Sequence, residues 1–251
     1  MFSFHLKTLL VLPHIDDEFA LAPLIKKFSS ISSNNFSIVY CAERLNSLSS
    51  LINQRRIENC KALEILGLKK TSPIFLNDFF RVNDKLLHNS SLEIFIFLKN
   101  QILKNNIKQV FTLNFEGGHP DHDSLALIVK KVSETVNVKT YFFPAYNSRN
   151  TFIFPVSVFR PLKSQVSFFK SYQFHKFCWL PSFLLGLIYK SERNAFLKLM
   201  PFILFQVFLS RKIMYTNRIN IETVNWNKSL SLNRYNVLKN DILEKIKIIG
   251  N

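Results

Sequence analysis

Short apolar runs alternate with longer stretches of helical spacing between residues 8 and 143, and this alternation limits the possible folds more than any other feature. Five runs have the length and composition of buried strands: residues 8–13, 36–42, 73–76, 109–113 and 139–143. The stretches between them favour helices at residues 18–28, 49–66, 92–105 and 121–136. Strands that alternate with helices are typical of a parallel sheet covered on both faces. The sequence therefore predicts an α/β fold, a Rossmann-like parallel sheet in a three-layer arrangement.

Length and composition indicate one domain. The chain has 251 residues, of which 47% are hydrophobic, and this is enough for a substantial core. Glycine is scarce, and no Gly/Ser-rich or Pro-rich linker divides the chain. We expect a single domain over residues 1–251, with a Rossmann-like core in 1–147 and a C-terminal elaboration in 148–251. Within the elaboration, residues 231–249 are expected to form an amphipathic helix.

The chain is strongly basic, with a formal net charge of +16. Such a charge favours anionic partners, namely nucleic acid, phosphosugars or anionic lipid head groups. The alternative is an ordinary solvated, Lys-rich surface, because the basic residues are spread out and form no long tract. We expect no nucleic-acid partner, since no recognised nucleic-acid-binding motif is present.

Cysteine usage favours a reducing compartment. Cys41, Cys60 and Cys178 are odd in number and lack CxxC spacing, as expected for reduced thiols. The apolar run at residues 9–13 is too short for a signal peptide and leads directly into His14. We expect a cytoplasmic protein, with peripheral contact at the inner face of the membrane as a further expectation.

A cluster of ionisable residues directly follows the first strand: residues 14–18 read His-Ile-Asp-Asp-Glu. Three successive carboxylates repel one another unless a counter-charge lies nearby. A divalent cation supplies that charge, and imidazole together with carboxylate suits zinc. This cluster alone offers two good ligands, so a third is needed from elsewhere in the chain.

The loop after the fourth strand can supply the third ligand. Residues 116–123 read Glu-Gly-Gly-His-Pro-Asp-His-Asp. Ligands in open α/β sheets bind at the carboxyl ends of the strands, where the two clusters are expected to meet. A catalytic zinc site uses three protein ligands and leaves one position open. His14, Asp17 and His122 fit that number, and we expect one zinc per chain.

The remaining ionisable residues of the two clusters are candidates for catalysis. Asp16 is expected beside the metal as the base that takes a proton from water. His119 is expected to stabilise the oxyanion or to protonate the departing amine. Asp121 is expected to orient an imidazole through a hydrogen bond. Each cluster alone has an ordinary interpretation, because Asp also caps helices and His also occurs in turns.

These motifs resemble the signatures of the PIG-L/LmbE-type zinc-dependent N-acetylglucosaminyl deacetylases. Residues 14–18 resemble the His-Pro-Asp-Asp-Glu signature of this family, and residues 116–123 look like its second signature. The stretch that starts at Arg55 and ends at Gly67 is similar to a helix between them. The resemblance covers residues 7 to about 147, with Ile15 in place of the usual Pro and Pro13 in place of a small residue.

The resemblance implies a Rossmann-like fold, a zinc ion and hydrolysis of the N-acetyl group of an N-acetylamino sugar. The substrate class would be an N-acetylglucosamine conjugate, either lipid-linked or a glycan precursor. The same resemblance implies that Arg55 and Asp78 contact the sugar. Each also has an ordinary interpretation, Arg55 as a surface residue of a helix and Asp78 as the end of a turn.

Residues 177–209 differ from the rest of the chain because they contain two largely uncharged stretches, 177–189 and 199–209. Each is shorter than the ~18–20 residues that cross a bilayer. Basic residues lie between and around them: Lys176, Lys190, Arg193, Lys198, Arg211 and Lys212. One hypothesis is an apolar surface that rests on a membrane near the mouth of the active site. The other is that this segment fills the core or covers the sheet.

Two other functions remain open from the residues alone. A metal-dependent phosphoesterase would keep the metal site, although two-metal phosphoesterases need more ligands than these clusters offer. A non-enzymatic basic module that binds membranes or nucleic acid would need no metal. A metal assay separates the last alternative from the two enzymes, and release of acetate or of phosphate separates the enzymes from each other. We make no prediction of oligomeric state.

Overall fold

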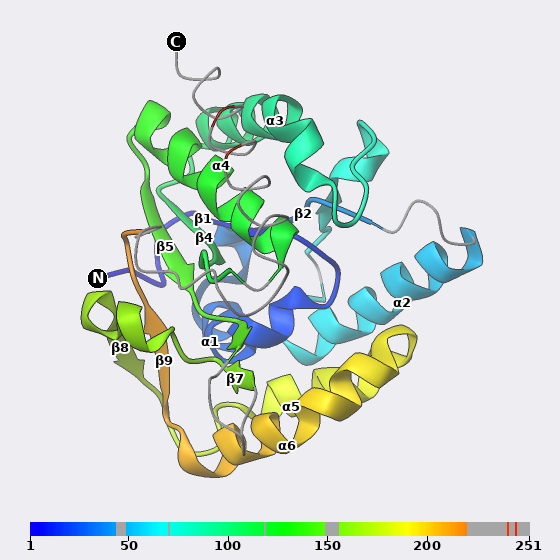
Figure 1. Ribbon diagram of the computed structural model, residues 1–251, viewed down its shortest axis with the longest axis vertical. Helices are drawn as coiled ribbons and strands as arrows, with labels where there is room; N and C mark the ends of the chain where they lie inside the picture. The colour runs from blue at the N-terminus through cyan, green and yellow to red at the C-terminus, as the bar shows by residue number, and fades with distance from the viewer. Residues whose placement is uncertain are drawn as a thin grey trace.

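A five-stranded parallel sheet forms the centre of the molecule (Figure 1). The computed structural model describes residues 1–43, 49–69, 71–117, 119–148 and 156–219, with residues 240 and 244. The sheet order is β3-β2-β1-β4-β5, and every pair of neighbours is parallel. The strands are β1 (Thr8–Leu12), β2 (Phe36–Tyr40), β3 (Ile74–Phe75), β4 (Gln109–Leu113) and β5 (Lys139–Phe143). The α/β prediction is confirmed, and of the helix expected at 231–249 the structure describes only residues 240 and 244.

Helices cover both faces of this sheet. They are α1 (Ala22–Ser32), α2 (Ser49–Ile65), α3 (Ser91–Lys104) and α4 (Pro120–Val136). Leu10 and Leu12 of β1 belong to the core on the side of α1 and α2. Leu9 and Val11 belong to the core on the side of α3 and α4. Because both sides of the strand are covered, β1 is apolar throughout and lacks an alternation of polar and apolar residues.

The order of the strands places the two polar clusters side by side. From β1 the chain adds β2 and β3 on one side of the sheet, and it adds β4 and β5 on the other. The order of strands therefore reverses between β1 and β4, and ligands of open α/β sheets bind at this point. Residues 14–18 follow β1, and residues 114–122 follow β4 at the same edge.

The first helical segment differs from its prediction at residues 18–28. A 3₁₀ turn, η1, covers Asp17–Leu21, and α1 then continues to Ser32. The physical reason is Pro23, which has no N–H to donate to the carbonyl of Phe19. That carbonyl accepts a hydrogen bond from the hydroxyl of Ser182 instead, at 2.7 Å.

The C-terminal part adds two small antiparallel ladders and a helical pair. β6 (Tyr146–Ser148) pairs with β7 (Val156–Val158), and β8 (Lys170–Gln173) pairs with β9 (Lys212–Tyr215). The pair consists of α5 (Leu180–Ile188) and α6 (Arg193–Leu209), joined by the 3₁₀ turn η6 (Lys190–Glu192). Short 3₁₀ turns complete the described elements: η2 (Ser33–Asn35), η3 (Leu76–Asp78), η4 (Leu87–Ser90) and η5 (Lys163–Phe168).

The α5–α6 pair lies on the α1 and α2 side of the sheet (Figure 1). Trp179, Leu185 and Tyr189 join the same core cluster as α1 and α2. The expectation that part of 177–209 covers the core therefore holds for the inner side of the pair. Among the described residues, no helix is both long and apolar enough to cross a membrane.

Candidate active site

The turn after β1 is held in an unusual backbone conformation. Asp16 has a φ of 103°, in the left-handed region that a side chain with a Cβ rarely adopts. The turn is closed by short-range bonds, since the amide of Asp16 donates to Glu18 Oε2 at 3.1 Å and the amide of Phe19 donates to the Asp16 carbonyl at 3.1 Å. The amide of His14 donates to Asp17 Oδ2 at 3.0 Å. Local strain at a residue fixed in this way often accompanies function.

The turn after β4 begins α4, and its side chains cap the helix. His119 is the N-cap, and its Nδ1 accepts a hydrogen bond from the amide of Asp121 at 3.2 Å. Pro120 follows at a first-turn position, where its missing N–H costs nothing. Asp123 Oδ1 accepts from the amides of Glu116 and Gly117 at 2.8 and 3.1 Å, which fixes the loop before the helix.

The two turns bring their ionisable side chains together. Asp17 bridges two imidazoles, with Oδ2 lying 3.2 Å from His14 Nδ1 and Oδ1 lying 3.3 Å from His122 Nε2. The ring of His119 lies 4.9 Å from that of His14 and 5.0 Å from that of His122, measured between centroids. Residues that are about a hundred positions apart in the chain thus form one cluster.

The other side of His14 is held by two carboxylates. Its Nε2 lies 2.9 Å from Asp121 Oδ2 and 3.3 Å from Asp84 Oδ1. Asp121 is fully buried and also accepts from the amides of Lys85 and Leu87, at 2.6 and 3.1 Å. The imidazole beside Asp121 is therefore that of His14, in the arrangement in which a carboxylate orients a metal-binding histidine.

The donor atoms of this cluster fit a zinc ion. Nε2 of His14 faces Asp121 and Asp84, whereas Nδ1 faces Asp17; in a neutral ring the two carboxylates favour the hydrogen on Nε2, which leaves Nδ1 for a metal. Atoms that bind a tetrahedral zinc at about 2.0–2.1 Å are about 3.3 Å apart. The separations of Asp17 from His14 and His122, 3.2 and 3.3 Å, are close to that spacing, and they are made by its two different oxygens, Oδ2 and Oδ1.

The electrostatics of the cluster also favour a cation. Burial acts to raise the pKa of Asp17, but the charges and hydrogen bonds of His122 and His14 outweigh burial and hold that pKa well below its usual range. Burial acts to lower the pKa of His14, but its bonds to Asp121, Asp17 and Asp84 raise that pKa well above its usual value. Positive charge is thus stabilised between these carboxylates.

His119 belongs to two groups of possible metal ligands. In each group, every residue offers one ligand atom, and these atoms all lie within 4.8 Å of one another. Among the described residues, one such group is His14, His119 and His122, and another is His14, Asp84, His119 and Asp121. Because His119 Nδ1 accepts a backbone hydrogen bond, the hydrogen of its neutral ring lies on Nε2. Burial, followed by the charges of His122 and His14, lowers the pKa of His119 to about 4 and keeps the ring neutral.

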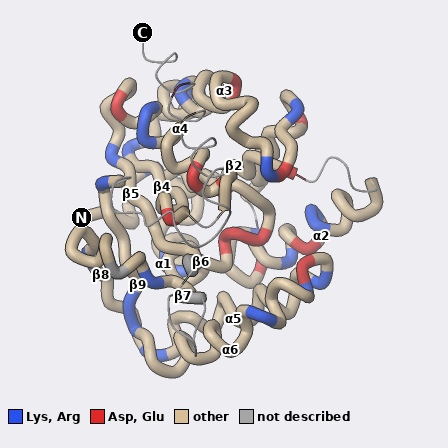
Figure 2. The backbone as a smooth tube through the Cα atoms, viewed as in Figure 1, with Lys and Arg blue, Asp and Glu red and all other residues tan. Residues whose placement is uncertain are grey.

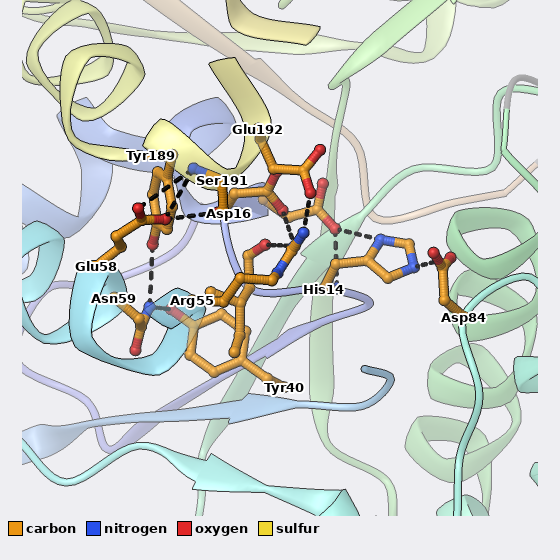
Figure 3. A network of polar contacts seen from close by, with 12 residues as sticks. His14, Asp16, Tyr40, Arg55, Glu58, Asn59, Asp84, Tyr189, Ser191 and Glu192 are labelled. Atoms are coloured by element: carbon orange, nitrogen blue, oxygen red, sulfur yellow. Dashed lines mark hydrogen bonds and ion pairs between the residues drawn. The ribbon is translucent and has the colours of Figure 1, made fainter. Parts of the chain in front are cut away.

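Asp16 points toward the guanidinium of Arg55 rather than toward His14 (Figure 3). Arg55, on α2, donates from Nη2 to Asp16 Oδ1 at 3.3 Å and to the carbonyl of Ile15 at 2.7 Å. Its Nη1 donates to Glu192 of η6. Burial, with the charges of Asp17 and Glu192, raises the pKa of Asp16 well above its usual value, although the Arg55 charge opposes this.

A buried polar network fixes the turn after β1 to the neighbouring helices (Figure 3). Glu18 accepts from the hydroxyl of Tyr189 and from Asn59 Nδ2, which also donates to Tyr40 at 2.7 Å. Burial raises the pKa of Glu18 to about 7. On the same side, Ser191 Oγ donates to Glu58 Oε2 at 2.5 Å. The turn after β1 is therefore tied both to α2 and to the end of α5.

A cavity of about 400 Å³ opens at this cluster. Its lining combines the turn after β1, Arg55 of α2 and the first half of α6. Its ionisable lining residues are His14, Asp16, Asp17, Glu43, Arg55, Asp84, Lys85, His119, Glu192 and Lys198. The five carboxyl groups among them outnumber the three Lys and Arg side chains, although the protein as a whole is strongly basic.

The two residues that the resemblance assigns to the sugar lie in different surroundings. Arg55 lines the cavity and donates hydrogen bonds to Glu192, to the Ile15 carbonyl and to Asp16. Asp78 is half-exposed and pairs with Arg56 Nη2 at 2.8 Å. Arg56 also binds Glu43, which does line the cavity, whereas Asp78 is not among the lining residues. Contact of Arg55 or Asp78 with a sugar stays a prediction.

Asp84, Lys85 and Glu192 also lie at the site, although no motif in the sequence indicated them. Asp84 and Lys85 lie between η3 and η4, where no motif marks them. Glu192 lies some 140 residues after Arg55, in the C-terminal elaboration. The sequence carries a weak signal for Glu192, because it is the single acidic residue in the largely apolar segment 177–209.

Comparisons with solved structures agree with this fold. The structure resembles an antimicrobial pseudoaglycone deacetylase (TM-score 0.57, 12% identity, 84% of this chain and 96% of that one). It also resembles a deacetylase of teicoplanin biosynthesis (TM-score 0.52, 14% identity, 75% and 85%) and a conserved protein of Thermus thermophilus (TM-score 0.51, 15% identity, 88% and 98%). These likenesses show a shared fold.

No curated protein matches the sequence. A family model described as PIG-L, GlcNAc-PI de-N-acetylase, matches residues 9–133, about half of the chain. This match begins within β1, ends within α4 and contains both polar clusters. With the motifs, the strand order and the meeting of the two clusters in agreement, the chain belongs to the PIG-L family.

Proposed function

We propose that the protein is a zinc-dependent hydrolase that removes the N-acetyl group from an N-acetylamino sugar, with an N-acetylglucosamine conjugate as the substrate class. Membership of the de-N-acetylase family supports an N-deacetylase. The observation that carries the proposal is that His14, Asp16, Asp17 and His119 line one cavity, and that Asp17 also contacts the imidazole of His122, which is not among the lining residues.

His14, Asp17 and His122 are the proposed zinc ligands. Asp17 contacts both imidazoles, through Oδ2 to His14 and Oδ1 to His122, and Asp121 contacts the other nitrogen of His14. His119 is not assigned as a ligand, because its Nδ1 is engaged by the helix and its Nε2 carries the hydrogen. Zinc bound here would polarise the amide carbonyl and acidify a water molecule.

Asp16 is the proposed base. Its strained backbone directs the carboxylate into the cavity beside Asp17, while Arg55 holds one of its oxygens. The burial that raises its pKa makes it a better proton acceptor. Asp16 takes the proton of the attacking water, and that proton is then available for the departing amine, so that acetate and a free amine are the products.

His119 is the proposed donor to the oxygen of the acetyl group. Its neutral ring presents Nε2–H to the cavity, and this donor gains strength as negative charge develops on that oxygen. We propose that Arg55, besides holding Asp16, contacts the sugar where it lines the cavity, and that Asp78 contacts the sugar beyond Arg56. A cavity of about 400 Å³ is large enough for a sugar ring.

The test measures zinc content and product release on the purified protein. We expect about one zinc per chain and equal release of acetate and free amine from N-acetylglucosamine conjugates. Release of phosphate from phosphoesters, without acetate, would identify a phosphoesterase instead. The ligand assignment has its own test: Asp17→Asn should lower the zinc content, whereas His119→Ala should keep it. The opposite pattern would place His119 among the ligands.

A further inference from the structure

The α5–α6 pair has an outer face made of large apolar side chains. Seven of them, on these helices and on the turn before α5, have exposed fractions between 45% and 68%: Phe177, Leu180, Leu187, Leu197, Phe205, Phe208 and Leu209. The rings of Phe177 and Phe208 are in contact, with centroids 6.1 Å apart. The face therefore continues from α6 to the turn before α5. We call these seven residues the outer apolar face.

The same helices also bury an apolar side. Leu185, Phe196 and Ile203 are almost fully buried and pack on the core of the sheet. A helix that is apolar on all sides is normally surrounded by protein or by lipid. The inner side of the pair meets this condition through the core, and the outer side requires another apolar environment.

Basic residues flank this face in the sequence. Between residues 174 and 219, all of which the structure describes, seven residues are Lys or Arg and one is acidic. The seven are Lys176, Lys190, Arg193, Lys198, Arg211, Lys212 and Arg218. The acidic residue, Glu192, turns inward and binds Arg55. Figure 2 shows basic residues in blue along β9, and in the sequence Arg211 and Lys212 come shortly after the end of α6.

We propose that the outer apolar face inserts shallowly into the surface of an anionic lipid bilayer. Exposed Leu and Phe with Lys and Arg around them form the usual composition of an interfacial segment, because the apolar side chains enter the bilayer and the cations meet the head groups. A second copy of this chain suits the face poorly, since a symmetric contact would place the same basic residues against each other.

This docking sets the orientation of the catalytic cavity. Phe196, Lys198 and Leu199 of α6 line the cavity, and Leu197 between them belongs to the outer apolar face. The cavity therefore opens beside the surface that rests on the bilayer. The docking does not depend on the proposed chemistry, because it rests on the exposure and charge of α5 and α6.

Co-sedimentation with lipid vesicles tests the proposal. The purified full-length protein is mixed with phosphatidylcholine vesicles or with vesicles that also contain phosphatidylglycerol, at low and at high salt. We expect binding to the anionic vesicles that weakens as salt screens the basic residues. Protein that stays in the supernatant with anionic vesicles at low salt would overturn the proposal, as would equal binding to both vesicle types.

Two matched triple variants locate the contact. Leu197→Gln, Phe205→Gln and Phe208→Gln together should weaken binding at least about tenfold, because they remove apolar surface that enters the lipid. The control variant is Leu92→Gln, Ile96→Gln and Leu103→Gln on α3, whose side chains are exposed to a similar degree, 49% to 58%. The control should bind as the unchanged protein does. Equal loss in both variants, with unaltered thermal unfolding, would show that the face has no special role.

Discussion

The turns after β1 and β4 bury ionisable side chains, whereas the α5–α6 pair exposes apolar ones. In the turns, ionisable groups are withdrawn from solvent, and Asp121 makes contacts with His14, Lys85 and Leu87 while remaining fully buried. In the helical pair, large apolar groups face solvent, and Phe208 keeps 68% of its surface exposed. Each arrangement is costly unless something compensates for it.

The two regions therefore differ in their proposed roles. The turns hold the reacting groups, and the helical pair places the protein on a membrane. The buried carboxylates and imidazoles are compensated by their mutual contacts and, in the proposed function, by a zinc ion. The exposed Leu and Phe side chains would be compensated by the lipid surface proposed above. The two regions meet where Glu192 binds Arg55 and where Ser182 binds the Phe19 carbonyl. Substitutions in each region should therefore have distinct effects.

The largest expected effect comes from removing a proposed ligand in the turn after β4. His122→Ala should abolish both zinc binding and hydrolysis, because a three-ligand site cannot hold the metal with two. Metal analysis and acetate release are the measurements. His175→Ala, at an exposed position of the C-terminal part, is the matched control and should retain both. Full zinc content in the His122 variant would remove His122 from the ligand set.

A smaller loss, with the metal retained, is expected at Asp16. Asp16→Asn keeps the size of the side chain but removes the proton acceptor, so kcat should fall about 10²–10⁴-fold while the zinc content stays near one per chain. Loss of zinc in this variant would make Asp16 a ligand and reverse the assignment of Asp16 and Asp17. Near-normal kcat would place the base elsewhere.

His119→Ala should lower kcat about 10²–10³-fold, because it removes a hydrogen-bond donor to the developing negative charge. Its zinc content should be unchanged, which separates it from His122→Ala. The variant also removes the N-cap acceptor of α4, at a cost of about 1 kcal/mol in stability. Asn at this position can still cap the helix, so His119→Asn should be as slow as the Ala variant and more stable. Unchanged turnover in both would leave His119 a purely structural role.

The sequence predicted the strands and helices of the catalytic half well, because fully covered strands such as β1 and β4 are continuous apolar runs between helices of regular spacing. It also predicted that the two polar clusters would meet, because the carboxyl ends of parallel strands lie at one edge of the sheet, although it did not predict that β1 and β4 are neighbours. It did not predict Asp84 or Glu192 at the site. Their positions depend on long-range packing of segments that carry no periodic or motif signal, and the two faces of α6 were likewise not separable from its composition.

Glu192 tests whether the helical pair contributes to chemistry as well as to placement. Glu192→Gln removes one of the two carboxylates around Arg55, which leaves the guanidinium less constrained and Asp16 less well placed. We expect kcat to fall about tenfold with zinc content unchanged, since misplacement of a catalytic group slows turnover. Glu192→Asp keeps the charge and should recover part of the loss. If neither variant alters kcat, the pair serves placement alone.

The smallest expected effect concerns the attachment of the helical pair to the catalytic half. Ser182 is fully buried, and its hydroxyl donates to the Phe19 carbonyl that Pro23 leaves without a helical partner. Ser182→Ala removes that donor and leaves a buried carbonyl unsatisfied, so the free energy of unfolding should fall by about 1–3 kcal/mol. Ser210→Ala, whose hydroxyl bond to Lys212 is exposed, should change it by less than about 0.5 kcal/mol. Chemical denaturation measures both. An equal effect of the two variants would show that the buried bond does not fasten α5 to the turn after β1.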